Sequence, residues 1–88
     1  MSFQRSLIKT KFVKNMLETQ LREETEKWIA KAKARRKSVK HGSKHLKNID
    51  AYISDSEYFL SKNDLIHSFE AIIWAWSWIE ILEELKQL

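Results

Sequence analysis

The chain of 88 residues contains no cysteine and no proline, and Gly42 is its single glycine. Without cysteine there is no disulfide framework and no thiolate metal site, which suits a reducing cytoplasm. Proline and glycine interrupt helices and build tight turns, so their near absence leaves long helices uninterrupted. The hydrophobic residues recur at spacings of three and four, not two. The sequence therefore predicts one all-α domain, located in the cytoplasm and without a cofactor.

Charge is distributed very unevenly along the chain. The formal net charge is +4, but residues 1–47 hold 14 Lys/Arg against 4 Asp/Glu, whereas residues 48–88 hold 2 against 8. The two halves should attract each other, so part of the basic surface should face the acidic half. The high pI therefore does not by itself indicate a nucleic-acid partner.

The hydrophobic pattern predicts a three-helix up-and-down bundle with a long first helix and a C-terminal helical hairpin. The first helix is expected at about 6–34, a basic connection at 35–43, the second helix at about 44–61 and the third at about 64–86. Gly42 and Ser43 are the predicted stop and restart, and Asn63 and Asp64 the tight turn of the hairpin. The predicted inner stripe of the first helix consists of Leu17, Leu21, Trp28 and Ala32.

The third helix carries three of the four tryptophans and is apolar over most of its circumference. At 100° per residue, Leu65, Phe69, Ile72, Trp76 and Ile79 share one face. A second face needs a cover as well, either from this chain or from a second copy or another helical protein. The run is too short and too often interrupted by Glu to span a bilayer, so no membrane is expected. The predicted self-association face consists of Ala71, Trp74, Ala75, Trp78, Leu82 and Leu85.

Residues 31–47 form the most basic stretch, with eight Lys/Arg and no acidic residue. Such a stretch can contact phosphates without reading sequence, which gives nucleic-acid binding as the alternative function. A solvated stretch that partly neutralises the acidic hairpin is the competing interpretation. No aromatic side chain is interleaved, so stacking on single-stranded bases is not predicted. The candidate phosphate contacts are Lys31, Lys33, Arg35, Arg36, Lys37, Lys40, Lys44 and Lys47.

A catalytic or metal site is not predicted. Arg36 and His41 have the Arg-x4-His spacing of ribonucleases of the HEPN superfamily, in which Arg would hold the phosphate and His would transfer a proton. A stretch this rich in Arg and His yields that spacing by chance, and it precedes the hairpin. His41 and His45 are four residues apart, but lysines surround them and no acidic residue is near in sequence. A shared metal ion is therefore not expected.

The predicted hairpin carries a pattern of aromatic, acidic and small residues. It reads Tyr52-x-x-Asp55-Ser56-x-Tyr58-Phe59-Leu60, then Asp64, then Ser68-Phe69-x-Ala71-Ile72-x-Trp74-Ala75. Over about residues 46–85 it resembles the archaeal domain-of-unknown-function family 357, in which a glycine is usual at the position of Asn63. The resemblance implies a three-helix up-and-down bundle and supplies no activity. The sequence thus predicts a non-catalytic helical interaction module that self-associates.

Overall fold

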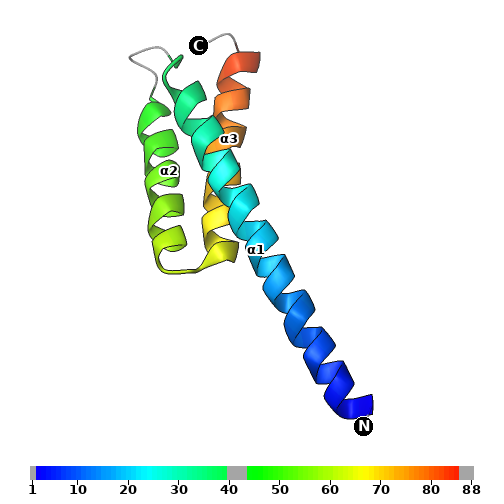
Figure 1. Cartoon of the computed structure of the whole chain (residues 1–88). Helices are drawn as coiled ribbons and strands as arrows, with labels where there is room; N and C mark the ends of the chain where they lie inside the picture. The colour runs from blue at the N-terminus through cyan, green and yellow to red at the C-terminus, as the bar shows by residue number, and fades with distance from the viewer. Residues whose placement is uncertain (1, 40–43, 86–88) are drawn as a thin grey trace.

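The computed structural model describes residues 2–39 and 44–85, with side chains from Asn15 onward. Its helices are α1 (Ser2–Arg36), α2 (Leu46–Ser61) and α3 (Leu65–Glu84). α1 and α3 run in the same direction and α2 runs opposite to both (Figure 1). No strand occurs in the described ranges. The predicted all-α, three-helix up-and-down bundle is confirmed.

The turn between α2 and α3 has the predicted chemistry. Asn63 adopts a left-handed conformation with φ of 60°, which asparagine tolerates better than most residues other than glycine. The backbone N–H of Asp64 then donates to the carbonyl of Phe59 at 2.9 Å, which closes the end of α2. The Asp64 carboxylate accepts from the backbone N–H of His67 at 3.3 Å and so caps α3. This short turn makes α2 and α3 antiparallel neighbours.

The connection between α1 and α2 differs in detail from the prediction. α1 continues to Arg36, and the backbone N–H of Val39 donates to the Arg36 carbonyl at 3.1 Å. Val39 is buried, so the chain folds back over the core just after α1 ends. Gly42 and the predicted cap Ser43 lie outside the described residues. The residue that precedes the first turn of α2 is His45, whose side chain makes no capping hydrogen bond.

The core forms where α3 lies against both of its neighbours. Each of the buried α3 residues falls within one continuous arc of about 120° on a helical wheel. Ile72, Ala75, Ile79 and Leu82 are fully buried there, and Ile49 of α2 and Ala32 of α1 are buried with them. The core therefore takes about half of each of the two predicted faces of α3. The buried α3 residues are Leu65, Ser68, Ala71, Ile72, Ala75, Ile79 and Leu82.

Two buried serines join α2 to α3. The Ser56 hydroxyl donates to the Ser68 carbonyl at 2.7 Å, and the Ser68 hydroxyl donates to the Ser56 carbonyl at 2.6 Å. Both residues have an exposed fraction of 0%. Because each short side chain reaches the backbone of the other helix, the two backbones must approach closely at this level. The reciprocal bonds also satisfy both hydroxyls, which would be costly to bury without partners.

α1 contributes a shorter inner stripe than the sequence predicts. Thr25, Ile29 and Ala32 are buried, and Trp28 packs against the core with its ring 5.3 Å from that of Trp76. The prediction for Leu17 is wrong, because this side chain is 59% exposed. The reason is length: at 1.5 Å per residue α1 spans about 52 Å, whereas α3 spans about 30 Å.

The extra length of α1 gives the molecule an elongated shape. Its Cα extents are 63 × 23 × 15 Å and its radius of gyration is 17.1 Å, against about 12 Å for a compact domain of this size. Figure 1 shows the N-terminal half of α1 continuing past the hairpin turn with no other helix of the chain beside it. We call residues 2–17 the projecting segment. The bundle proper is built from the rest of α1 and the hairpin.

Candidate interaction surface

Three of the eight cations of the basic stretch form ion pairs within the chain. Lys33 pairs with Glu57 of α2 at 2.5 Å, and Arg35 pairs with Glu83 of α3. Arg36 forms a two-point contact with Asp50 of α2, with Nε–Oδ1 at 2.6 Å and Nη2–Oδ2 at 2.9 Å. The basic end of α1 thus binds both helices of the acidic hairpin, as the charge asymmetry predicts.

The remaining predicted phosphate contacts are scattered. The Lys31 ammonium lies 4.6 Å from the centroid of the Trp28 ring, a cation–π distance. Lys37 and Lys44 are exposed, whereas Lys40 lies outside the described residues. Lys47 is exposed near the start of α2. The structure therefore leaves fewer unpaired cations at this end, among the described residues, than the sequence count suggests.

The Arg36–Asp50 contact changes the acid–base behaviour of both partners. Its hydrogen bonds to the ionised carboxylate lower the pKa of Asp50 below its ordinary value of 3.8, partial desolvation acts against this shift, and the charge of Arg36 adds to it. The same hydrogen bonds raise the pKa of the Arg36 guanidinium. A carboxyl whose pKa is lowered by folding stabilises the fold above its unfolded pKa, and this contribution is lost as the pH falls through the folded pKa.

Replacement of Asp50 by asparagine should therefore destabilise the fold near neutral pH and much less in acid. Because the Asp50 side chain is 53% exposed, the difference from wild type should be at most about 1 kcal/mol near pH 7. It should shrink between about pH 5 and pH 2, as the wild-type carboxyl becomes protonated. Urea unfolding at a series of pH values measures both quantities. Asp55→Asn is the matched control, since Asp55 is exposed and makes no ion pair with the described residues; an equal pH dependence in both variants would contradict the assignment.

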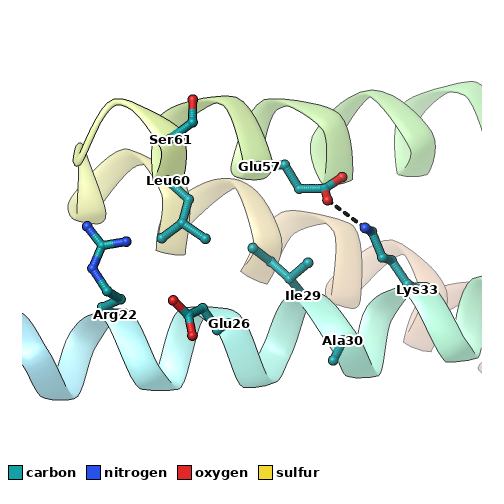
Figure 2. Close-up of a pocket in the computed structure, with 8 residues that line it drawn as sticks. All are labelled: Arg22, Glu26, Ile29, Ala30, Lys33, Glu57, Leu60 and Ser61. Carbon is teal, nitrogen blue, oxygen red and sulfur yellow. Dashed lines mark hydrogen bonds and ion pairs between the residues drawn. The ribbon is translucent and has the colours of Figure 1, made fainter.

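An open cleft runs between α1 and α2 (Figure 2). Ile29 and Leu60 supply its apolar floor, and the Lys33–Glu57 ion pair crosses one end. At the other end Arg22 donates a hydrogen bond to the Asn63 side chain in the hairpin turn. Three of the four charged side chains of this cleft, Arg22, Lys33 and Glu57, thus hold α1 against α2 and the hairpin turn. The full lining is Arg22, Glu26, Ile29, Ala30, Lys33, Glu57, Leu60 and Ser61.

The predicted self-association face of α3 is mostly covered by α2. Ala71, Ala75 and Leu82 are buried in the core. Trp78 is half-buried and stacks on His45, with ring centroids 4.4 Å apart. This part of the prediction is wrong, because helical periodicity shows that a face needs a cover but not that α2 supplies it. Trp74 and Leu85 remain exposed at 54% and 60%.

A different part of α3 is left without a cover. On the helical wheel it lies between the side that contacts α1 through Trp76 and the side that contacts α2 through the Tyr52–Trp74 pair. Ile66 is 71% exposed and Ile81 is 45% exposed on this side. An open hollow is lined by Ile66, Phe69, Glu70, Ile73, Trp74 and Ser77. We call Ile66, Phe69, Ile73, Trp74 and Ile81 the outer strip.

The outer strip continues onto α1. A second hollow joins Phe69 of α3 to Leu17 and Leu21 of α1. Apolar side chains therefore extend from the uncovered side of α3 to the start of the projecting segment, where Met16 is 47% exposed. Sequence reasoning missed the isoleucines of this strip, because they belong to neither of the two apolar faces that it described on α3.

α3 is also the one described helix that is long and apolar enough to cross a membrane by length and composition. The core helix of a soluble bundle passes the same test, and α3 has its buried side against α1 and α2.

Within the described ranges, no group of three His, Cys, Asp or Glu residues could hold a metal ion. Arg36 and His41 have the Arg-x4-His spacing of the HEPN ribonucleases. Arg36 is bound to Asp50, and His41 lies outside the described residues.

The fold and its surfaces define a small three-helix bundle protein with an ion-paired basic end and an uncovered apolar strip. The chain matches the family described as "Protein of unknown function (DUF357)" over residues 11–88 and belongs to that family. It is similar to the crystal structure of protein AF1782 from Archaeoglobus fulgidus, which carries the same family description. The sequences are 46% identical, the match covers 81% of this chain and 93% of the other, and the TM-score is 0.76. The comparison with curated proteins found no match.

Proposed function

We propose that this protein is a non-catalytic helical interaction module of the cytoplasm that self-associates through the outer strip of α3. The observation that carries the proposal is the grouping of large exposed apolar side chains along one side of a helix. A row of such side chains, rimmed by charged residues, is typical of a surface that binds another protein. Apolar area of this kind gains free energy when a partner removes it from water.

The polar residues of the outer side fit this role. Glu70, Glu80 and Glu84 lie on the same side of α3, between the apolar side chains of the strip, and are not paired with any described cation. They keep the strip soluble in the isolated chain and offer charges to a basic partner surface. The basic end of α1, by contrast, is engaged in ion pairs with the hairpin. The geometry therefore favours a protein contact at α3 over a phosphate contact at the basic stretch.

Replacement of Ile73 by glutamate should weaken self-association strongly. Ile73 is half-buried at the middle of the outer strip, and a charge at the centre of an apolar interface is desolvated without a partner. In a two-fold dimer the change occurs twice, so the dimer Kd should rise about 100-fold. Sedimentation equilibrium over nanomolar to millimolar concentrations measures this. Tyr58→Glu is the control, since Tyr58 is exposed on α2, away from the strip. A wild-type chain that stays monomeric over the whole range would refute the proposal.

A further inference from the structure

Most of the projecting segment of α1 and most of the outer strip of α3 are left uncovered by the chain; the contacts are at the edges, where Trp74 stacks on Tyr52 and Phe69 shares a hollow with Leu17. Side chains at 15–20 are all exposed, so α1 is no longer packed into the core here, although this stretch still borders open hollows beside the hairpin. Figure 1 shows the segment continuing straight beyond the hairpin turn. Most of the stability of a helix in a protein comes from tertiary packing, so a packing partner would stabilise this end of α1.

The two uncovered elements match in length. Residues 2–17 span about 22 Å as a helix, and the same distance separates Ile66 from Ile81 along α3. A segment from a second molecule can therefore cover the outer strip from end to end. The hollow formed by Leu17, Leu21 and Phe69 lies where such a segment would pass from α1 to α3.

The two elements also match in charge. The sequence of the projecting segment contains Arg5, Lys9, Lys11 and Lys14 and no acidic residue. α3 contains no Lys or Arg, and the uncovered side of the helix carries Glu70, Glu80 and Glu84. Opposite charges along two facing helices favour the correct pairing and disfavour the pairing of two α3 strips, which would bring the glutamates together.

We infer that the outer strip of α3 receives the projecting segment of α1 from a second copy of the chain. The inference rests on the proposed self-association and names the surfaces that carry it. Each copy supplies one segment and one strip, so the contact is reciprocal and closes as a two-fold dimer. The α1 helices cross antiparallel near Leu17, and each projecting segment then runs antiparallel to α3 of its partner.

This arrangement fixes a register between the two molecules. If residue 17 of one copy lies beside residue 66 of the other, antiparallel helices bring residue 6 beside residue 77, because both advance 1.5 Å per residue. In the same register Lys14 falls next to Glu70, and Arg5 falls within one turn of Glu80. Two of the four basic residues of the segment thus lie at the levels of glutamates on the uncovered side of α3.

The absence of cysteine allows this register to be tested by cross-linking in the full chain. One sample of the chain carries Ser6→Cys and a second carries Ser77→Cys; the two are mixed, equilibrated and treated with a short bifunctional maleimide. The matched control mixes Ser6→Cys with Ser54→Cys, since Ser54 is exposed on α2 away from the strip. The 6–77 pair should give about tenfold or more heterodimer than the 6–54 pair, because the complex holds its cysteines together.

The outcomes separate this inference from the proposed function. A dimer in sedimentation together with equal yields from the two pairs, or with efficient linking of Ser77→Cys to itself, overturns the segment-on-strip arrangement and leaves self-association standing. A wild-type monomer overturns both. Sedimentation of the chain with anionic lipid vesicles that abolishes the 6–77 link would assign the strip to a membrane surface and would likewise overturn the inference.

Discussion

Replacement of Ile72 by alanine should lower the free energy of unfolding by about 3–4 kcal/mol. Ile72 is fully buried at the middle of α3 and belongs to the core shared by all three helices. Removal of three carbon atoms there loses their transfer free energy and leaves a cavity that packed helices fill only in part. For a chain of this length the midpoint of thermal unfolding should fall by about 15 °C or more.

The control for this change lies on the same helix. Ile66→Ala removes the same atoms from a side chain that is 71% exposed, so it should change the free energy of unfolding by about 0.5 kcal/mol or less. Both variants are unfolded in urea at the lowest workable protein concentration, where self-association contributes least to stability. Equal losses in the two variants would show that the core does not lie where the structure places it.

Replacement of Ser68 by leucine should cost about 2–4 kcal/mol, although the change adds apolar area. Ser68 has no exposed surface, and its hydroxyl donates to the Ser56 carbonyl across the α2–α3 contact. A leucine there forces the two helices apart and removes this hydrogen bond. Ser68→Ala, which removes the hydrogen bond without adding bulk, should cost about 1 kcal/mol.

The order of stability of Ser68→Leu and Ser68→Ala separates two explanations of why a small residue occupies position 68. If close approach of the helices is what requires a serine, leucine must be worse than alanine. If only the hydrogen bond matters, the two variants should be equally destabilised. Ser54→Leu, at an exposed position on α2, should change stability by no more than about 0.5 kcal/mol. Thermal unfolding of all three variants provides the comparison.

The ion pairs at the basic end explain why the number of Lys and Arg residues in a stretch does not by itself indicate a nucleic-acid binding surface. Lys33, Arg35 and Arg36 are part of the densest basic stretch, and all three bind acidic side chains of the hairpin. Each pair is partly exposed and contributes little to stability on its own. Together they fix the C-terminal end of α1 over both helices of the hairpin. A charge count over a sequence window cannot distinguish such internal neutralisation from a free basic surface.

The family relationship extends the sequence-based resemblance. The pattern over residues 46–85 lies in the hairpin, whereas the family match begins at residue 11 and so includes most of α1. The hairpin pattern can be understood from the structure. Ser56, Ser68, Ala71 and Ala75 are buried small residues at the helix contacts, and Asp64 caps α3. These residues serve the fold, which agrees with a pattern that predicts architecture and no activity.

The sequence by itself determined the helices and the turn of the hairpin. The near absence of glycine and proline, the spacing of apolar residues and the Asn63–Asp64 pair act within a few residues of chain, so local reasoning reached them. It also determined that the basic and acidic halves attract each other. Each of the two predicted faces of α3 is apolar, and each contributes side chains to the core.

Only the tertiary structure decided that large apolar side chains on the exposed side of α3 remain uncovered. Two apolar faces about 120° apart can be covered by α1 and α2 together, and the uncovered side then contains Ile66, Ile73 and Ile81. Helical periodicity gives the angles between side chains but not the positions of neighbouring helices. Likewise the hydrophobic spacing of α1 did not show that Leu17 lies outside the core. Exposure depends on contacts between residues far apart in sequence, and these are fixed only when the three helices pack.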